Sequence, residues 1–497
     1  MLYKKCQLNT SPHLGKNFES NRVFLFKRYW SFSTFLMLSA LSSARTYARR
    51  VRIPNPRKGF MPIPGKNPVV CKTALEAVQC IKSNDRVFIH EIASTPHELV
   101  KALETRANEL KDVKVAGFFQ TKIGELLKED DFHLNAFKSN SHFIGPNERP
   151  LIHKKNPKAI TFVPMFLTEV PQHLRSPDYP IDVSLLSLSP PDKHGYCSLG
   201  PNLAAGKAGA ESGKILVAEI NPNVPRTLGN SFVHYSHLDY VFETNRKLNQ
   251  YPAQKQTQEQ ELIGKHIATL IKDGDCLQAG IGGVADAALG YLKNHKNLGV
   301  HTEMFAEGMI DLIKSGAINN SKKVVKRGFI TAAFAMGTER LYSEINDNPL
   351  YYFDSVDFTN DPNISSMNPN FIAINSALQV DLTGQVCADS IGSLQFSGVG
   401  GQVDFVRGAS MSDGGRAIIA LPATASNGKI SRITTSLTYG SSVTTSRWYG
   451  VTVITEFGIA DLWGLNTRQR AQALINIAHP KFREQLAKEA AELYGTD

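Results

Sequence analysis

The stretch Ile271-Lys-Asp-Gly-Asp-Cys-Leu-Gln-Ala-Gly-Ile-Gly-Gly283 decides the fold, because an earlier part of the same chain matches it. Residues 81–93 read Ile-Lys-Ser-Asn-Asp-Arg-Val-Phe-Ile-His-Glu-Ile-Ala, at an offset of 190 residues. Each copy predicts a short apolar strand that ends in a turn. A helical stretch and a second strand follow each copy, and this order predicts parallel sheets with right-handed crossovers. We therefore predict an α/β fold of two related domains, with a site in the cleft between them.

The elements around the two copies are predicted from local patterns. In the first copy, Thr95-Pro-His-Glu98 predicts a capping box with proline at the first helical position. The following helix has one apolar face, and its members are Leu99, Leu103, Ala107 and Leu110. The second strand of this copy is expected over residues 113–119. In the second copy, we expect the helix over residues 286–293 and the strand over residues 298–302.

A polar, glutamine-rich stretch over residues 245–261 is typical of a domain boundary. The 497 residues are enough for two or three domains of ordinary size. We predict an N-terminal domain over residues 59–250 and a C-terminal domain over residues 251–497. Within the second domain, the patterns predict a strand at 451–455 and helices at 262–272, 467–477 and 480–494.

The first 58 residues carry almost all of the net charge. They contain twelve Lys or Arg and a single acid, Glu19, so their net charge is +11, against +10 for the whole chain. The remaining chain is nearly neutral, which argues against a nucleic-acid surface. A segment that is rich in Arg and Ser and poor in acids is typical of a mitochondrial presequence, and we predict one over residues 1–58.

The competing interpretation of this segment is a signal peptide or membrane anchor over residues 29–44, followed by a small-residue cleavage site. That apolar run has 16 residues, which is fewer than the roughly 20 that a membrane helix needs. We therefore expect a protein of the mitochondrial matrix, or of a mitochondrion-derived organelle, with no membrane partner. Processing is expected between Arg45 and Pro56.

Chemistry-bearing residues follow the strand of the second copy but not that of the first. The glycine-rich turn Gly280-Ile281-Gly282-Gly283-Val284 lets backbone N–H groups approach a ligand closely. Glu303 then follows at the end of the next predicted strand. A covalent carboxylate needs such fixed donors beside it, because they stabilise a developing oxyanion.

Two other interpretations of the same residues are open. Glu303 at the N-terminus of a helix over residues 304–314 would be favoured by the helix dipole alone. Alternatively, Gly280 to Ala285 has the form G-x-G-x-x-A, and Glu303 lies about 20 residues further on, as in a dinucleotide-binding fingerprint.

A second glycine loop lies in Phe396-Ser-Gly-Val-Gly-Gly-Gln-Val-Asp-Phe405. Together with the first loop and Glu303, it makes the chain resemble the class I coenzyme A transferases, in the branch of acetyl-CoA hydrolases and of acetate:succinate and 4-hydroxybutyrate CoA-transferases. The resemblance runs from about Lys72 to Arg483. It implies that the amide of Ile281, or of a neighbour among Gly280, Gly282, Gly283 and Val284, forms part of an oxyanion hole and contacts CoA. It also implies that Gly400, with Gly401 as its neighbour, supplies the second amide, and that Lys429 binds CoA.

The resemblance implies a covalent mechanism without a metal or another cofactor, since CoA is itself a substrate. Glu303 would attack the thioester, and the CoA thiolate would then form a glutamyl-CoA thioester that an acceptor carboxylate resolves. We expect transfer of CoA from acetyl-CoA to succinate. The alternatives are 4-hydroxybutyrate as a substrate, or hydrolysis with water as the acceptor. The family also implies a homodimer or a higher homo-oligomer.

Two further residues are candidates for pairing with a substrate carboxylate. Arg226 has the appropriate charge, and His194 lies in a Pro/Gly-rich turn of the kind that positions functional groups. Both also have a purely structural interpretation. The six cysteines and the His90–Glu91 and His97 group lack metal-ligand spacing, so no metal site is expected.

Overall fold

The structure is a computed structural model, and it describes residues 59–118, 123–128, 130–153, 160–253, 255–280 and 282–495. Residues 57–497 form one compact unit. The predicted presequence over residues 1–58 and the site residue Ile281 lie outside the described residues. Within the described part of the chain, no helix is long and apolar enough to cross a membrane.

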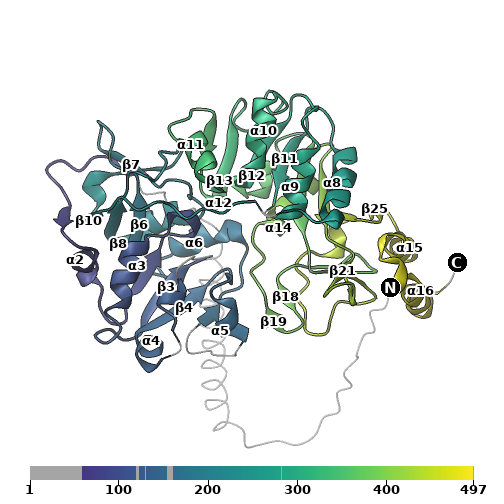
Figure 1. The fold of residues 1–497 in the computed structure, drawn as a ribbon, viewed down its shortest axis with the longest axis horizontal. Coiled ribbons are helices and arrows are strands. Elements are labelled where there is room, and N and C mark those ends of the chain that lie inside the picture. The colour runs from purple at the N-terminus through teal and green to yellow at the C-terminus, as the bar shows by residue number, and fades with distance from the viewer. Residues whose placement is uncertain are drawn as a thin grey trace, which may run out of the picture. The chain divides into compact units, whose positions relative to one another are not determined.

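The first half of the described chain forms an eight-stranded sheet in which the described pairings are all parallel (Figure 1). In spatial order its strands are β1 (Val69–Cys71), β10 (Tyr240–Glu243), β8 (Gly213–Ile220), β6 (Ile181–Leu188), β2 (Arg86–Ile89), β3 (Val113–Gly117), β4 (Phe137–Ser141) and β5 (Ile160–Phe162). A parallel sheet that is covered on both faces needs apolar strands. β6 satisfies this need, since it is buried from Val183 to Leu188.

The second half forms another eight-stranded sheet among the described residues, parallel except for the edge pair β24–β25. In spatial order its strands are β14 (Tyr351–Phe353), β13 (Ile330–Met336), β12 (Gly299–Ala306), β11 (Cys276–Ala279), β15 (Phe371–Ser376), β20 (Arg416–Ala420), β24 (Thr452–Thr455) and β25 (Gly458–Asp461). The α/β class predicted from the sequence is confirmed. The strands of the two copies are β2 and β11, and each pairs in parallel with the strand that follows it, β3 or β12.

Short helices connect the strands of the first half. The α-helices are α2 (Ala74–Ala77), α3 (His97–Glu104), α4 (Asp131–Ala136), α5 (Arg149–His153), α6 (Val170–Leu174) and α7 (Gly206–Ser212). The 3₁₀ helices are η1 (Val78–Cys80), η2 (Ile92–Ser94), η3 (Ile123–Glu125), η4 (Leu167–Glu169) and η5 (Tyr235–His237). A separate antiparallel pair joins β7 (Tyr196–Ser198) to β9 (Phe232–His234).

The second half carries helices of three to fifteen residues. They are α8 (Gln258–Leu270), α9 (Gly283–Gly290), α10 (Gly308–Lys314), α11 (Glu339–Ile345), α12 (Val356–Thr359), α13 (Pro362–Ser365), α14 (Gln402–Met411), η6 (Arg447–Tyr449), α15 (Thr467–Ile477) and α16 (Pro480–Tyr494). Short strands complete it, namely β16 (Gln379–Asp381), β17 (Val386–Cys387), β18 (Ser390–Ile391), β19 (Leu394–Gln395), β21 (Thr424–Ala425), β22 (Ile430–Ser431) and β23 (Ile433–Thr434). The two C-terminal helices were predicted with these bounds.

Several predicted bounds are wrong. β12 continues to Ala306, so Glu303 lies inside a strand and not at its end. The helix expected over residues 304–314 begins at Gly308, which rules out the helix-capping interpretation of Glu303. The capping box is also absent, because the Thr95 hydroxyl donates to the Ile92 carbonyl at 2.9 Å and Pro96 is the N-cap. Local residue preference was overridden by strand pairing in the first two cases and by the hydrogen bond from Thr95 to η2 in the third.

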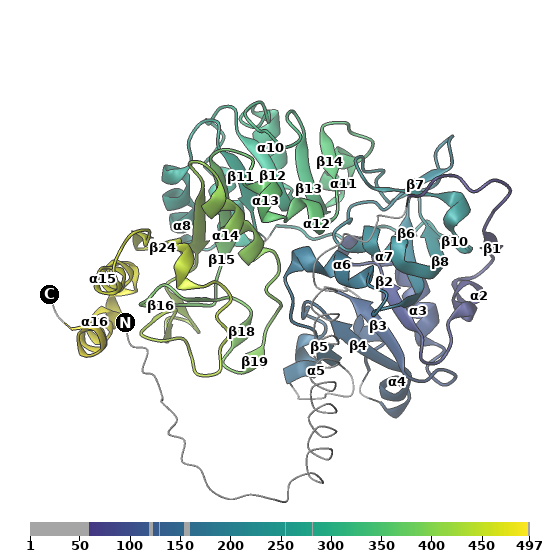
Figure 2. The ribbon, with the colours of Figure 1, turned by 180° about the vertical axis from the view of Figure 1, so that it is seen from behind.

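The two sheets share one hydrophobic core. A single cluster of buried residues contains Phe88 and Ile92 from the first half and Met304 and Phe334 from the second. Backbone hydrogen bonds reinforce this contact, since the Leu203 N–H donates to the Ala333 carbonyl at 2.9 Å. Figure 2 shows α6 and α7 of the first half facing α12 and β13 of the second. The shared core thus holds the segment around Leu203 of the first half against β13, which is the neighbour of β12 in the second sheet.

Candidate active site

Glu303 lies in the middle of a central strand. β12 is flanked by β11 and β13, with Thr302 opposite Ala332 and Met304 opposite Phe334. The residues on either side of Glu303 are buried, whereas Glu303 itself is half-buried. A carboxylate on a strand within a packed sheet has little freedom to move, so its neighbours decide its chemistry.

An amide from another loop holds the Glu303 carboxylate. The Asn360 side-chain amide donates to Glu303 Oε2 at 2.7 Å. Asn360 is fully buried and follows directly after α12. The Thr359 hydroxyl donates to Asn360 Oδ1 at 2.9 Å, which fixes the amide so that its N–H₂ group faces Glu303.

The second glycine loop approaches the same carboxylate from the other side. The Gly401 N–H donates to Glu303. A Cβ atom on Gly401 would lie 2.1 Å from Glu303 Oε2 and 2.4 Å from Asn360 Nδ2, so any side chain there would displace the carboxylate and the amide. Glycine at position 401 is therefore what lets these two groups meet. The carbonyl of its neighbour Gly400 accepts the Leu167 N–H at 3.3 Å, and φ of Gly400 is +60°.

Burial changes the acidity of Glu303. It raises the pKa of the Glu303 carboxyl to about 7, although the hydrogen bonds from Asn360 and Gly401 favour the charged form. A carboxylate with a pKa near neutrality is more basic than an exposed one and is still substantially ionised at physiological pH. That combination suits a nucleophile.

A small apolar cavity opens beside Glu303. Its lining combines the two halves, with Ile92, Phe118, Phe143 and Leu167 from the first and Glu303, Phe334, Met336 and Gly400 from the second. The cavity holds about 30 Å³ that water can occupy, and one water needs roughly 10–15 Å³ by this measure. Among its described lining residues, Glu303 is the one with a charge. The site thus has room for only about two or three waters, and residues of both halves line it.

The first glycine loop follows β11, the strand next to β12. β11 pairs with β12 so that Cys276 faces Gly299 and Leu277 faces Val300, and this register, continued by three residues, sets Gly280 level with Glu303. The Thr302 hydroxyl supports this register by donating to the Ala279 carbonyl at 3.3 Å. Gly282 is the N-cap of α9 with φ at +119°, a backbone conformation that requires glycine.

The other two residues of this loop pack tightly. A Cβ atom on Gly283 would lie 2.5 Å from Gln260 Oε1, and Val284 is buried. Helix α9 begins at Gly283, shortly after β11 ends at Ala279. The first N–H groups of a helix have no partner within it. Such an N-terminus favours negative charge beside it.

The remaining predicted residues lie away from the cavity. Lys429 is exposed in the turn between β21 and β22. Arg226 donates to Asp192 at 2.6 Å and to Asp347 at 3.1 Å, so its charge is paired within the protein. His194 is exposed in the turn before β7. The structure does not bring Lys429, Arg226 or His194 into the lining of the Glu303 cavity.

Asp404 was missed by the sequence analysis, although it lies in the second glycine motif. It is 6% exposed and accepts the Thr168 N–H at 3.2 Å. Burial raises its pKa to about 7, and the Glu303 carboxylate adds to this rise.

Within the described residues, no group of three or more His, Cys, Asp or Glu is arranged to hold a metal ion.

Comparison with known protein families identifies the family to which this chain belongs. The N-terminal domain of the acetyl-CoA hydrolase/transferase family matches residues 69–252, and its C-terminal domain matches residues 337–490. A 4-hydroxybutyrate coenzyme A transferase from Clostridium kluyveri is 45% identical, over 84% of this chain and 96% of its own. The chain belongs to the acetyl-CoA hydrolase/transferase family.

A further curated relative is a CoA-transferase, and a solved structure has the same fold. A succinyl-CoA:acetate/propanoyl-CoA:succinate CoA transferase from Fasciola hepatica is 39% identical, over 88% of this chain and 91% of its own. The crystal structure of RipA from Yersinia pestis is 35% identical, with a TM-score of 0.80, over 86% of this chain and 98% of that one. The resemblance and the fold predicted from the sequence are therefore confirmed, as is membership of the CoA-transferase class.

Proposed function

We propose that this family member transfers CoA between short carboxylic acids through a glutamyl-CoA thioester on Glu303. One observation carries the proposal. The Glu303 carboxylate is held by the Asn360 amide and the Gly401 N–H at the edge of an apolar cavity. These two donors can hold the carboxylate in place for attack and then bind the oxyanion that forms on its carbon.

The reaction proceeds by two exchanges at acyl groups. A Glu303 oxygen attacks the thioester carbonyl carbon, the C–S bond breaks, and CoA leaves as a thiolate from an acyl-glutamyl anhydride. The thiolate then attacks the glutamyl carbon, the C–O bond breaks, and the first acid leaves as its carboxylate. The acceptor carboxylate reverses both steps. Because one thioester replaces another, the reaction needs no other energy source or cofactor.

The oxyanion in the second exchange forms on the Glu303 carbon. One oxygen of Glu303 already accepts the Asn360 amide at 2.7 Å, so that donor is in place when the charge develops. The first glycine loop, with the α9 N-terminus behind Gly280, is available for the oxyanion on the substrate carbon. We assign Gly280, Ile281 and Gly282 to CoA and substrate contact on this basis.

We propose acetyl-CoA and succinate as the first pair to test, giving acetate and succinyl-CoA. The Fasciola hepatica relative bears the name of a succinyl-CoA:acetate transferase, and an acetyl group is small and apolar like the cavity. The apolar lining also favours a second candidate. A short acid without a second charge, such as the 4-hydroxybutyrate named for the Clostridium kluyveri relative, places no carboxylate against Phe143 or Phe334.

An acceptor panel distinguishes these functions. Purified protein is mixed with acetyl-CoA and propionate, butyrate, 4-hydroxybutyrate or succinate, and the new acyl-CoA is measured by chromatography. Succinyl-CoA as the main product supports the first pair, whereas butyryl-CoA or 4-hydroxybutyryl-CoA supports the second candidate. Free CoA that appears at the same rate without any acceptor would identify a hydrolase. Glu303→Gln should abolish every product, whereas the exposed Glu492→Gln should abolish none.

We also propose that residues 1–58 direct the protein to the mitochondrial matrix, that neither a nucleic acid nor a membrane is its partner, and that it works as a homodimer or higher homo-oligomer. The charge of +11 within those residues supports the first point. Mass spectrometry of the mature N-terminus after organelle isolation tests targeting, and light scattering of the purified protein tests assembly.

A further inference from the structure

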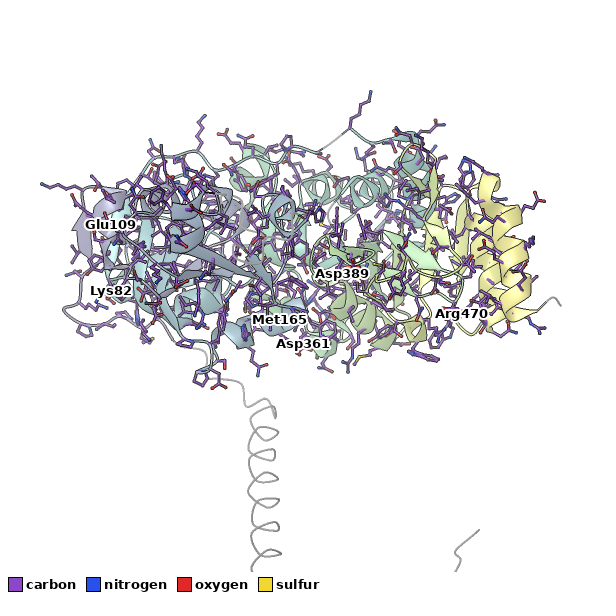
Figure 3. All side chains as sticks on the ribbon, turned by 90° about the horizontal axis from the view of Figure 1, so that it is seen from below. Lys82, Glu109, Met165, Asp361, Asp389 and Arg470 are labelled. Carbon is purple, nitrogen blue, oxygen red and sulfur yellow. The ribbon has the colours of Figure 1, made fainter. Side chains whose placement is uncertain are left out.

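The two halves of the molecule are joined at the second glycine loop by two hydrogen bonds. The Leu167 N–H donates to the Gly400 carbonyl at 3.3 Å, and the Thr168 N–H donates to Asp404 Oδ2 at 3.2 Å. Leu167 and Thr168 belong to η4 of the first half, whereas Asp404 lies in the first turn of α14. In Figure 3, Met165 is labelled near the middle of the molecule, as is Asp361, the neighbour of Asn360.

The first of these bonds sets the direction of the Gly401 N–H. The Gly400 carbonyl and the Gly401 N–H belong to one planar peptide unit and point in opposite directions. When Leu167 holds the carbonyl on one side, the N–H is turned to the other side, where Glu303 accepts it. Glycine at position 400, with φ at +60°, has little intrinsic preference for this orientation, so the orientation needs an external contact.

The second bond anchors the segment that supplies that contact. Asp404 is buried, and within the described residues it forms no ion pair. The groups that face it are the Thr168 N–H and hydroxyl and the carboxylates of Glu169 and Glu303. A buried carboxyl beside two other carboxylates is unfavourable unless it binds a donor. Thr168 is that donor, and it directly follows Leu167.

We propose that Asp404 is a positioning residue for the CoA-transfer site: it clamps Thr168, so that Leu167 holds the 400–401 peptide with the Gly401 N–H on Glu303. This inference rests on the proposed function of Glu303. It makes one of the two donors to the nucleophile dependent on a contact between the halves. The hydrogen bond that Asp404 accepts comes from the Thr168 N–H and not from the nucleophile, so its proposed action on Glu303 passes through Thr168 and Leu167.

The test compares two substitutions that both remove the charge. Asp404→Asn keeps an acceptor oxygen for the Thr168 N–H, whereas Asp404→Leu has a similar volume and no acceptor. We expect kcat to fall about 10²-fold in Asp404→Leu, as for the loss of one oxyanion donor, and less than about tenfold in Asp404→Asn. KM for the acyl-CoA should change by less than about threefold in both. Thr168→Val, which keeps the N–H, should behave like Asp404→Asn.

The pH profile of kcat/KM is the readout that a merely structural role would not move. Both substitutions remove the repulsion from the Asp404 carboxylate, which lowers the pKa of Glu303. Only Asp404→Leu also loses the Gly401 hydrogen bond, which raises that pKa. The acid limb of Asp404→Leu should therefore lie at higher pH than that of Asp404→Asn. Asp404→Ala provides the same comparison if the leucine variant does not fold.

The outcomes separate this inference from the proposed function. Equal kcat and equal acid limbs in the folded Asp404→Asn and Asp404→Leu proteins would overturn the positioning role, as would an effect confined to the melting temperature. If the wild-type protein forms no CoA adduct with acetyl-CoA, the proposed function fails, and the inference fails with it. If the wild-type protein forms the adduct and Asp404→Leu forms it equally fast, only the inference fails.

Discussion

The two glycine loops beside Glu303 use glycine for opposite reasons. Gly282, in the first loop, has φ at +119° and open space around the position of a Cβ atom, so its backbone conformation is what requires glycine. Gly401, in the second loop, has an ordinary φ of −93°, but a Cβ atom would lie 2.1 Å from the Glu303 carboxylate. The first loop is built within its own half, and the second is held by Leu167 of the other half. A glycine motif in a sequence can therefore reflect either an unusual backbone conformation or a close contact with another group. The structure is needed to tell which of the two applies.

The largest effect should come from filling the space at the second loop. Gly401→Ala places a methyl group against Glu303 and Asn360, so we expect kcat to fall about 10³-fold through loss of the donor and displacement of the nucleophile. Steady-state assays with acetyl-CoA measure this. Gly290→Ala is a matched control, since it lies at the exposed end of α9 with open space around it, and it should keep full activity. An active Gly401→Ala protein would contradict the geometry of the second loop.

Removing the opposing donor should have the next largest effect. Asn360→Ala takes away the amide at 2.7 Å from Glu303, and we expect kcat to fall about 10²-fold with a smaller change in KM. The loss of this donor also raises the pKa of Glu303, so the acid limb of the pH profile should move to higher pH. Thr359→Val, which removes the hydroxyl that orients the amide, should give an intermediate loss. If KM alone changed, Asn360 would be a substrate contact rather than a partner of the nucleophile.

The raised pKa of Glu303 predicts a pH dependence of both rate and stability. The wild-type kcat/KM should fall as pH decreases below about 7, because the protonated carboxyl is not a nucleophile. The folded protein holds this proton more tightly than the unfolded chain, whose pKa is near 4.5. Stability is therefore present at low pH and is lost as pH rises from about 4.5 to 7.

Chemical denaturation of Glu303→Gln measures this stability term. The glutamine variant should be more stable than wild type by about 1–3 kcal/mol at pH 8, and this advantage should shrink as pH is lowered to about 4.5. The advantage is smaller than the full rise in the pKa of Glu303 would give, because Glu303 is half-buried and Asp404 titrates in the same range. An advantage that is independent of pH would show that the ionisation of Glu303 does not cause it.

The smallest effect should come from the conformational glycine. Gly282→Ala meets no neighbouring atom, so the cost is backbone strain at φ of +119°, about 1–3 kcal/mol of unfolding free energy. The activity of the folded protein should fall by about tenfold or less. Differential scanning calorimetry of Gly282→Ala and Gly401→Ala, together with their activities, sharpens the comparison. Gly282→Ala should lose more stability than activity. The reverse result would show that Gly282 also faces the reacting atoms.

The fold could be predicted from the sequence because it depends on a repeated local pattern. The copies at 81–93 and 271–283 became the central strands β2 and β11, and α15 and α16 had periodic apolar faces with clear starts. The extent of β12 could not be predicted, because Glu303 interrupts its apolar run and the residues after Glu303 also suit a helix. Pairing with β13 extends the strand to Ala306, which lies opposite Met336.

The site could be predicted only where one motif contains it. Glu303 and the two glycine loops are short motifs, but Asn360 comes from a loop 57 residues further along the chain with no pattern of its own. The cavity lining could not be predicted either, since it needs the packing of both halves. Arg226 was a reasonable candidate by charge, and its ion pairs with Asp192 and Asp347 explain its place in the structure.

The most direct test of the account is the mass of the Glu303 peptide after the protein is mixed with acetyl-CoA and digested. We expect a CoA-sized addition on Glu303 in wild-type protein, its absence in Glu303→Gln, and its discharge when an acceptor carboxylate is added. In Gly401→Ala the adduct should form far more slowly, whereas in Gly282→Ala its rate of formation should fall by about tenfold or less. Turnover of acetyl-CoA without any adduct on Glu303, or with an adduct on another residue, would contradict the central role of this carboxylate.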